Sequence, residues 1–473
     1  MTARTTSTVS LVDLLADDPR ITAVAQALAA GASRFLGGLW GSAAALVAGL
    51  LFRQVRRQAV LVVASLEETR DALEDLQTFG LAGEDPLLLP PLATAERAAA
   101  GFDAAAFAAR LVVLRELFMN PHPRLIVAPI DALLGPMVPR DRFAETVVRV
   151  RPGESLDPAA FLRRLLDREF LRVARVEAAG EVSLRGDVLD VYPWGARRPI
   201  RIELFDDEVE EIREFDPETQ RSIARVTMVR FPAARAADFR REGAAAARAF
   251  LEFLPPRSLL FLRDVDRLAE RVAGVRGAET AVFGADTDAV RVRLAAMPLP
   301  AGAGIINFRT TSVDVLGRTP RWPASLALSQ TLETVKRLLG RNHQVHVYTP
   351  GEGEPQRLKE VLAERLPEAV GRVHFAAGRL AVGFQLRDAG VAALSHDEFL
   401  VRQRGAAEAP PERPGVLRTR PIRDFLELAE GELVVHATHG IGRFLGLDVL
   451  ERAGVAEEFL AIEYRDAARL YVP

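Results

Sequence analysis

The chain has 473 residues, of which 49% are hydrophobic, 26% are charged and none is cysteine. That length and composition predict roughly two to four packed domains rather than a disordered chain. The absence of cysteine excludes disulfides, zinc–thiolate sites, thiolate catalysis and iron–sulfur clusters. The formal net charge of −3 gives the whole chain no electrostatic bias toward nucleic acid or acidic lipid, although local basic clusters can still exist.

The N-terminal stretch contains acidic residues and lacks the charged start and apolar core of a secretory signal. The uncharged segment 36–52 is marginally long enough to span a bilayer. It is rich in glycine and alanine, however, and it precedes an apolar strand and an amphipathic helix, which is typical of α/β proteins outside membranes. We therefore expect a cytoplasmic protein without a membrane segment.

Alternating strand and helix patterns predict an α/β domain at the start of the chain. Segment 59–64 is a continuous apolar run of the kind that forms a buried parallel strand, and the residues after it form a capping box that opens a helix. Segment 124–130 predicts a second buried strand, with a helix between them over 95–118. We assign residues 1–117 to this domain.

The stretch 181–221 predicts consecutive antiparallel strands, because apolar residues alternate with charged ones between turn-forming residues. With an amphipathic helix expected within 152–175, it forms an α+β unit that we place at 118–212. Short apolar strands among helical patterns then predict that the first α/β layer resumes over 213–325. The α+β unit is therefore expected to be an insertion into one discontinuous domain.

Two further folded units are predicted toward the C-terminus. Strand and helix patterns predict a small α/β domain over 326–401, and residues 402–425 form a linker rich in Pro, Gly, Ala and charge. Over 426–473, short alternating strands broken by turn residues predict a small β-barrel. The fold class is multidomain, α/β and α+β with an all-β end. Because the sequence stops within a strand-like pattern, we expect it to be the front part of something longer.

Residues 38–45 lie where a phosphate-binding loop would be expected. Gly38 matches the first position of G-x-x-x-x-G-K-[ST], but Ala43, Ala44 and Ala45 occupy the last three. The lysine that reaches the phosphates and the hydroxyl that holds magnesium are both absent. We therefore expect a degenerate P-loop-type domain that neither hydrolyses ATP nor holds a cofactor.

Two pairs of nearby histidines, His343 with His346 and His436 with His439, have the spacing of half a metal site. No third ligand has a matching spacing, and histidines satisfied by strand or turn backbone are more common, so we expect no metal. Residues 395–398 have the composition of a catalytic triad, but adjacent residues cannot adopt its geometry. We predict a helix N-cap there.

The stretch 181–221 resembles a signature shared by the excision-repair subunit UvrB and the bacterial transcription-repair coupling factors. The segments RGDVLDVYPWG and RIELFDDEVEEIREFDPETQRS match it almost throughout. The C-terminal GELVVHATHGIGRFLGL and EEFLAIEYRDAARLYVP are similar to the RNA-polymerase-interacting domain of the coupling factors, a CarD/Tudor-like barrel that CarD-type regulators also contain. Together the two resemblances indicate the coupling-factor family, with UvrB-like domains 1a, 2 and 1b preceding the small α/β domain.

This resemblance implies an adaptor. The α+β unit would recruit UvrA, and the family pattern places the contacting arginines at Arg172 and Arg185. The barrel would bind the β subunit of RNA polymerase in the strand region of Phe444, Leu447 and Leu450. ATP, magnesium and most contacts with DNA are expected of a motor that follows this chain in the family, and a monomer is expected.

Two alternative functions remain open at this point. One is a CarD-like transcription regulator with an unrelated front domain, which the signature at Arg185 disfavours. The other is an active UvrB-type DNA helicase, which residues 43–45 and the absence of tyrosine before Tyr192 disfavour, because UvrB inserts a tyrosine-rich hairpin into DNA. The individual residues also have alternative interpretations. Arg172 and Arg185 could be solvent-facing strand charges rather than UvrA contacts, and Leu450 could be a leucine of the barrel core rather than a polymerase contact.

Overall fold

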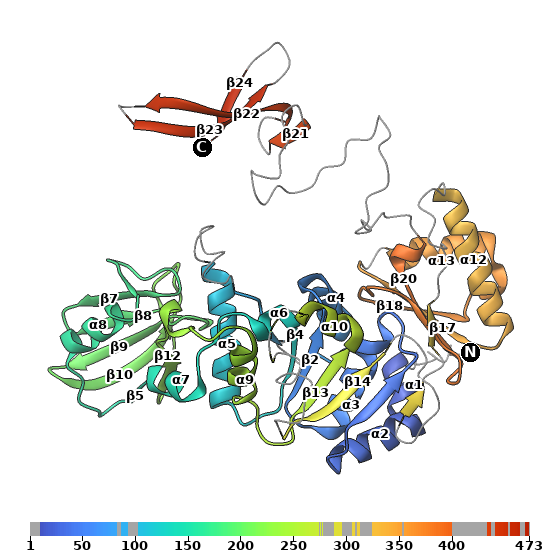
Figure 1. The fold of residues 1–473 in the computed structure, drawn as a ribbon, viewed down its shortest axis with the longest axis horizontal. Helices are drawn as coiled ribbons and strands as arrows, with labels where there is room; N and C mark the ends of the chain where they lie inside the picture. The colour runs from blue at the N-terminus through green and yellow to red at the C-terminus, as the bar shows by residue number, and fades with distance from the viewer. Residues whose placement is uncertain are drawn as a thin grey trace, which may run out of the picture. The chain divides into compact units, whose positions relative to one another are not determined.

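The computed structural model divides the chain into two compact units, Met1–Arg402 and Gln403–Pro473 (Figure 1). The residues that it describes are 10–82, 87–92, 103–273, 275, 277, 288–295, 305–307, 310–312, 324–351, 354–399, 433–436, 440–452, 455–463 and 469–472. The linker predicted at 402–425 lies outside these residues.

A parallel seven-stranded sheet forms the centre of the first unit, with strand order β15-β1-β14-β13-β2-β4-β3. Its strands are β1 (Arg34–Gly37), β2 (Ala59–Val63), β3 (Leu87–Leu88), β4 (Leu125–Pro129), β13 (Leu259–Arg263), β14 (Val290–Leu294) and β15 (Ile305–Asn307). β2 pairs with β4 on one side and with β13 on the other. The predicted discontinuous layer is therefore confirmed, because strands from before and after the insertion lie side by side.

Helices cover both faces of this sheet. In β2, Ala59, Leu61 and Val63 belong to one core, while Val60 and Val62 belong to the other, as expected for a strand buried on both sides. One face is covered by α1 (Leu11–Ala16), α2 (Pro19–Ala29), α3 (Ala43–Val55) and α4 (Leu66–Thr78). The other is covered by α5 (Ala104–Met119), α6 (Ile130–Leu134), α9 (Gly243–Leu251) and α10 (Val265–Val272).

Segment 36–52, which the sequence left marginally long enough to cross a membrane, forms the end of β1, the following turn and most of α3. Ala43 to Leu51 of α3 are all buried against the sheet and its neighbouring helices. Within the described part of the chain, we find no helix with the length and apolar character of a membrane span.

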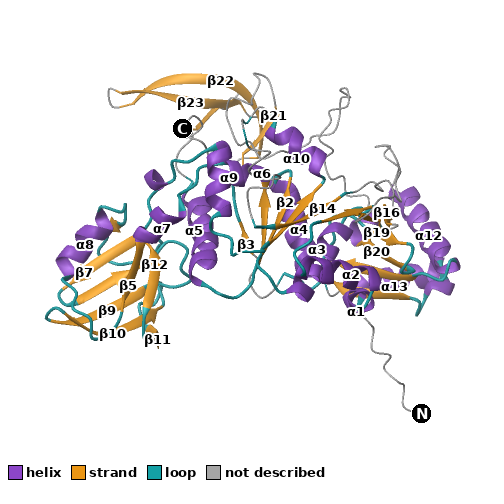
Figure 2. Cartoon of the chain, turned by 60° about the horizontal axis from the view of Figure 1, so that its bottom comes forward, coloured by secondary structure: helices purple, strands orange, loops and turns teal. Residues whose placement is uncertain are grey.

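The inserted α+β unit has a six-stranded sheet with order β11-β10-β9-β8-β7-β6. Its strands are β6 (Leu171–Arg172), β7 (Glu181–Arg185), β8 (Val188–Val191), β9 (Ile200–Phe205), β10 (Glu208–Phe215) and β11 (Ser222–Arg225). A two-stranded ribbon of β5 (Val147–Val150) and β12 (Val229–Pro232) accompanies it, with the helices α7 (Arg140–Thr146) and α8 (Pro158–Leu166) and the 3-10 turn η2 (Ala236–Asp238) (Figure 2).

The alternation of apolar and charged residues explains which side of this sheet is buried. Ile200, Ile202 and Leu204 are buried in the core of the unit, whereas Arg201 and Glu203 between them face outward. All neighbouring strands run antiparallel except β6 and β7, which are parallel. The predicted boundary between residues 212 and 213 falls inside β10, and β11 and β12 continue the same unit, so we extend it to residue 232.

The small α/β domain contains a five-stranded sheet with order β16-β19-β20-β17-β18. Its elements are β16 (Thr310–Ser312), α12 (Ala324–Gly340), β17 (Gln344–Thr349), α13 (Glu354–Arg365), η3 (Pro367–Ala369), β18 (Val373–Ala377), β19 (Phe384–Leu386), β20 (Val391–Ser395) and η4 (His396–Glu398). β16 pairs with β19, so the sheet includes residues that precede position 326, where we predicted the domain to begin.

The second unit is an antiparallel sheet of four strands in sequential order. They are β21 (Leu433–His436), β22 (Gly440–Arg452), β23 (Val455–Glu463) and β24 (Arg469–Val472). The register shifts between Phe444 and Gly446, where β22 carries a bulge. An all-β arrangement is confirmed for these residues, and closure into a barrel stays a prediction.

Candidate interaction surfaces

The turn between β1 and α3 has the position of a phosphate-binding loop. Gly38 and Gly41 adopt positive φ angles of 72° and 52°, which glycine tolerates without strain. Ala43, Ala44 and Ala45 follow in the first turn of α3 and are at most 2% exposed. The three alanines therefore serve as core residues of the helix, and they offer no side-chain group for a phosphate or a metal ion.

This turn is packed against the small α/β domain. The backbone NH of Ser42 donates to the carbonyl oxygen of Val382 at 3.1 Å, and the Ser42 hydroxyl accepts from the Val382 NH at 3.2 Å. A Cβ atom added to Gly41 would lie 2.8 Å from the same carbonyl oxygen. The space in front of the turn is therefore occupied by the chain's own backbone.

A buried carboxylate completes this junction. Asp75 on α4 is 1% exposed, and its Oδ1 accepts from the Ser42 hydroxyl at 2.7 Å and from the Ala381 NH at 2.9 Å. Burial raises the pKa of Asp75 to about 7, although the two hydrogen bonds and the charge of Arg263 oppose the shift. One turn along α4, the Thr78 hydroxyl exchanges hydrogen bonds with the backbone of residue 379.

In the α+β unit, the signature residues form an arginine–carboxylate cluster around Asp190 on β8. Asp190 is fully buried, and Arg201 on β9 donates to both of its oxygens, at 2.7 and 2.9 Å. Arg185 at the end of β7 donates to Asp190 Oδ2 at 2.7 Å, while its side chain stays 51% exposed. The Arg201 guanidinium also lies 4.7 Å from the ring centroid of Phe215. The cluster fixes the Arg185 guanidinium at the surface.

The two predicted UvrA-contacting arginines lie on neighbouring strands at one edge of the sheet. Arg172 on the edge strand β6 is exposed and pairs in register with Val182 on β7. Arg185 is three residues further along β7, so alternation places it on the opposite face from Val182. The structure therefore brings the two arginines to the same edge, on opposite faces of the sheet.

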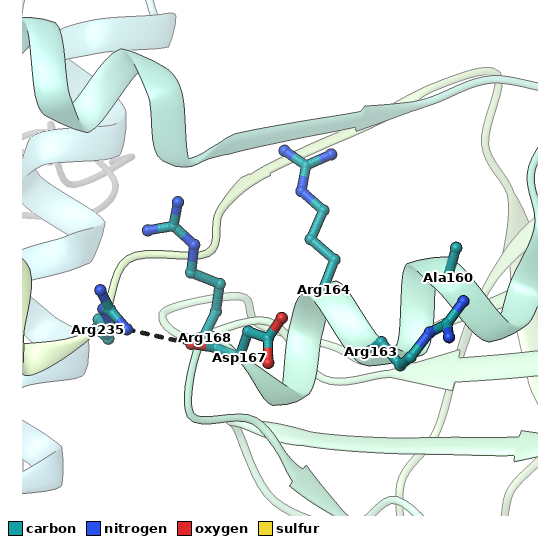
Figure 3. A pocket seen from close by; sticks show the side chains of 6 residues that line it. All are labelled: Ala160, Arg163, Arg164, Asp167, Arg168 and Arg235. Carbon is teal, nitrogen blue, oxygen red and sulfur yellow. Dashed lines mark hydrogen bonds between the residues drawn. The ribbon is translucent and has the colours of Figure 1, made fainter.

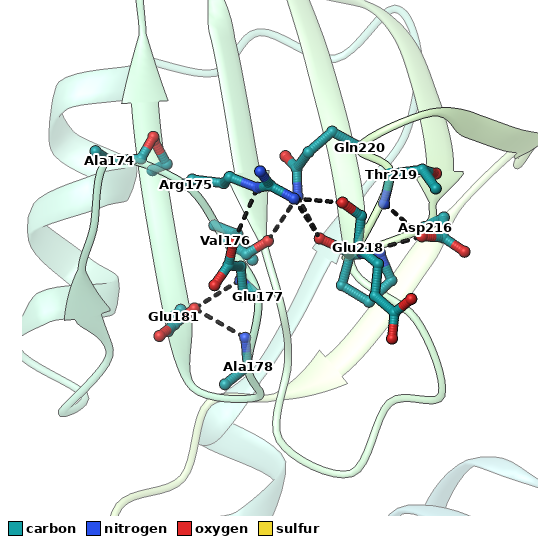
Figure 4. Close-up of polar contacts among 12 residues, drawn as sticks. Ala174, Arg175, Val176, Glu177, Ala178, Glu181, Asp216, Glu218, Thr219 and Gln220 are labelled. Carbon is teal, nitrogen blue, oxygen red and sulfur yellow. Dashed lines mark hydrogen bonds and ion pairs between the residues drawn. The ribbon is translucent and has the colours of Figure 1, made fainter.

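The second half of the signature holds the loop between these two strands (Figure 4). The Arg175 guanidinium donates to the carbonyl oxygen of Glu218, and the Gln220 amide donates to the carbonyl oxygen of Val176 at 3.0 Å. The Asp216 carboxylate accepts from two backbone NH groups of the same turn, at 2.8 and 2.9 Å. The motif FDPETQ therefore supports the edge of the sheet that carries both predicted arginines.

The three residues predicted for polymerase binding lie on β22. Phe444 is 4% exposed, so its side chain packs within the unit rather than offering a contact at the surface. Leu447 pairs in register with Leu460, and Leu450 pairs with Glu457. β21 pairs with β22 only as far as Arg443, so among the described residues the other edge of β22 has no strand beside it from Phe444 onward.

His346 and residues 395–398 belong to the packed small α/β domain, whereas His439 of the second predicted pair lies outside the described residues. His346 on β17 is 2% exposed, and burial together with His374, whose ring centroid is 5.0 Å away, lowers its pKa to about 4. The predicted helix start at 395–398 is confirmed as η4, where the Glu398 carboxylate accepts from the Ser395 NH at 2.9 Å. Among the described residues, no group of three potential ligands could hold a metal ion.

Comparison with protein families identifies two modules. Residues 148–236 match the UvrB interaction domain, and residues 428–473 match the CarD-like/TRCF RID domain. The first match runs from β5 to the first residue of η2 in the α+β unit, and the second covers the four strands of the C-terminal unit. These matches define a modular protein that joins a UvrB-type interaction domain to a CarD-like domain.

Comparison with curated proteins narrows this class. The chain is 25% identical over 528 residues to the transcription-repair-coupling factor of Bacillus subtilis (strain 168), covering 93% of the chain and 44% of that protein. It is 26% identical over 536 residues to the transcription-repair-coupling factor of Myxococcus xanthus, covering 92% of the chain and 44% of that protein. It is 22% identical over 436 residues to that of Staphylococcus aureus (strain MRSA252), covering 74% of the chain and 36% of that protein. The chain is a relative of the transcription-repair coupling factors, fits their N-terminal portion, and spans less than half of their length.

Proposed function

We propose that this chain is the adaptor portion of a transcription-repair coupling factor. In this role it recruits UvrA through the α+β unit and binds the β subunit of RNA polymerase through the C-terminal unit, as a cytoplasmic monomer. The observation that carries the proposal is the occurrence of both modules in one chain, at residues 148–236 and 428–473. The UvrB interaction domain argues against a CarD-like regulator with an unrelated front domain.

The UvrA-binding role is assigned to the edge strand β6 and its neighbour β7. Arg185 supports this role, because its half-exposed guanidinium is already oriented by Asp190 and loses little side-chain freedom when it meets a carboxylate of a partner. Arg172 on the exposed edge strand offers a second donor. A partner that contacts both arginines would pack around the edge of the sheet.

The polymerase-binding role is assigned to β22. Its edge is open beyond Arg443 among the described residues, and a strand of the partner could add to it through backbone hydrogen bonds. Leu447 and Leu450 on that segment would supply side-chain specificity. Phe444, being buried, would support the strand from within the unit.

We propose further that the chain binds no nucleotide and does not move on DNA. The turn at residues 38–45 lacks the lysine and hydroxyl of a phosphate-binding loop, and the backbone of Val382 fills the space in front of it. The same features argue against an active UvrB-type helicase. ATP and magnesium would serve a motor C-terminal to this chain, and that motor would make most of the contacts with DNA.

The test is a pair of binding measurements with the purified chain, one against UvrA and one against the isolated polymerase β subunit. We expect the chain to bind each partner separately, in the absence of nucleotide. Failure to bind UvrA would overturn the role of the α+β unit, and failure to bind the β subunit would overturn the role of the C-terminal unit.

A further inference from the structure

A second group of arginines lies on the α+β unit, around the C-terminal end of α8. Arg163, Arg164, Arg168 and Arg235 line a concavity of about 530 Å³ together with Ala160 and Asp167. Figure 3 shows that Arg164 and Arg168 point in the same direction, with Arg235 beside them. The sequence does not reveal this group, because Arg235 comes from a different element, just before η2.

Positive charge exceeds negative charge in this concavity. Arg168 and Arg235 share a single carboxylate, that of Asp238, at 3.2 and 3.4 Å. Asp167 is the acidic residue in the lining, and among the described ion pairs Asp238 is the carboxylate that pairs with these arginines. The side chains of Arg163 and Arg164 project from the exposed face of α8, whose opposite face buries Phe161, Leu162 and Leu165.

A second concavity of about 430 Å³ lies on the β5–β12 ribbon. Arg149, Arg151 and Arg230 line it, above Phe118, Ala144, Val147 and Met228. Arg149 and Arg230 stand directly opposite each other in the ribbon, an arrangement of like charges that destabilises a strand pair. Glu154, 3.6 Å from Arg149, is the carboxylate nearest to this pair among the described ion pairs. An unfavourable charge pair at the surface is relieved by an anionic partner.

The two concavities belong to one layer of the α+β unit. Phe161 and Leu165 of α8, together with Val148 and Val150 of β5, pack into the same core against one face of the six-stranded sheet. The outward sides of α8 and of the ribbon therefore both point away from that face. Arg235 follows Arg230 by five positions, so their Cα atoms lie within about 18 Å.

We propose that this arginine face binds the phosphate backbone of duplex DNA. The arginine face comprises Arg149, Arg151, Arg163, Arg164, Arg168, Arg230 and Arg235. Guanidinium groups pair bidentately with phosphates, and a row of phosphates engages several of them at once. An acidic peptide fits the larger concavity less well, because that concavity offers only Ala160 as an apolar contact, and protein interfaces need apolar or aromatic anchors.

The arginine face and Arg185 lie on opposite sides of the six-stranded sheet. α8 and the ribbon cover the face of the sheet on which the Val182 side chain lies. Arg185 is three positions further along β7, so its side chain lies on the opposite face. DNA bound to the arginine face would therefore leave Arg185 open to a protein partner. This inference concerns contacts of the chain itself with DNA, in addition to the partners proposed above.

The experiment measures binding of the purified full chain to a fluorescently labelled 20-base-pair duplex by anisotropy, at several salt concentrations between 50 and 200 mM. A protein that engages about four phosphates loses roughly 150-fold in affinity over this range, from a slope of about −0.9 per phosphate. The double variant Arg163→Ala/Arg164→Ala should bind more weakly at 50 mM salt and lose only about 12-fold over the same range, because it engages about two phosphates fewer.

Two controls make the result decisive. Arg365→Ala on α13 removes an exposed arginine from the small α/β domain, and it should keep the affinity and salt slope of the unaltered chain. Arg225→Ala removes an exposed arginine of β11 on the other face of the same sheet, in register with Arg213 and Arg201, and it should also keep both. The proposal is overturned if the double variant matches Arg365→Ala, or if a glutamate-rich peptide binds to the arginine face in a variant-sensitive way while the duplex does not. Circular dichroism verifies that the double variant is folded.

Discussion

Replacement of Asp75 by Asn tests the junction between the degenerate loop and the small α/β domain. The carboxylate is 1% exposed, and its Oδ2 atom has no hydrogen-bond partner among the described residues. Asn keeps an oxygen that accepts from the Ser42 hydroxyl and the Ala381 NH, and it removes the charge. Arg263 and Asp71 also act on this carboxylate, in opposite directions. The substitution therefore changes ionisation with little change in shape.

The sign and size of the effect follow from the raised pKa. Asp75 has a pKa of about 7 in the folded chain and 3.8 as an ordinary carboxyl, so between these values the folded state binds one more proton than the unfolded state. Stability from this group is then present at low pH and is lost as the pH rises toward 7, by about 1.4 kcal/mol per pH unit. Between pH 5 and pH 8 the loss amounts to about 3 kcal/mol.

The assay is urea unfolding of the first unit, followed by circular dichroism at pH 5, 6, 7 and 8. Relative to Asp75→Asn, the unaltered chain should lose about 3 kcal/mol of unfolding free energy across this range, most of it below pH 7. Asp266→Asn, the same chemical change at an exposed position of α10, should show no such difference. Parallel pH profiles for the unaltered chain and Asp75→Asn would refute the reasoning.

Two further predictions concern the signature cluster and the nucleotide site. Asp190→Ala should lower the unfolding free energy of the α+β unit by about 3–5 kcal/mol, because it leaves the partly buried Arg201 without its carboxylate. Arg185→Ala should lower it by no more than about 1 kcal/mol. Equal losses for the two variants in urea unfolding would contradict the structure. Adding 1 mM ATP with magnesium should leave the melting temperature unchanged. A ligand bound at 100 times its dissociation constant would add about 2.7 kcal/mol of stability and raise that temperature. A clear rise would therefore contradict the absence of a nucleotide site.

Local sequence patterns predicted the elements well where packing follows directly from periodicity. The apolar run that forms β2, the capping box at the start of α4 and the alternation in β9 each define an element and its buried face without reference to the rest of the chain. The discontinuous parallel layer also followed, because apolar strands of the same kind flank the insertion. Boundaries were less predictable, since β10 continues through residue 212 and β16 pairs with a strand more than 70 residues later.

The interaction surfaces depend on contacts that sequence spacing does not reveal. Ser42 and Val382 are 340 residues apart, and nothing in either segment indicates that their backbones meet. The charge around α8 was visible as an amphipathic helix, but the concavity requires Arg235 from another element. Arg185 was placed by its resemblance to the signature, whereas its contact with a fully buried Asp190 became apparent only in the folded sheet.

The central claim, that two separate parts of the chain bind two different partners, is tested most directly by titrating three proteins against UvrA and against the polymerase β subunit. The proteins are the unaltered chain, Arg185→Ala and Leu450→Glu. We expect Arg185→Ala to weaken binding to UvrA at least tenfold and to leave binding to the β subunit unchanged, and Leu450→Glu, provided that it folds, to do the reverse. Unaltered UvrA binding by Arg185→Ala, or equal loss of both partners in either variant, would contradict the account.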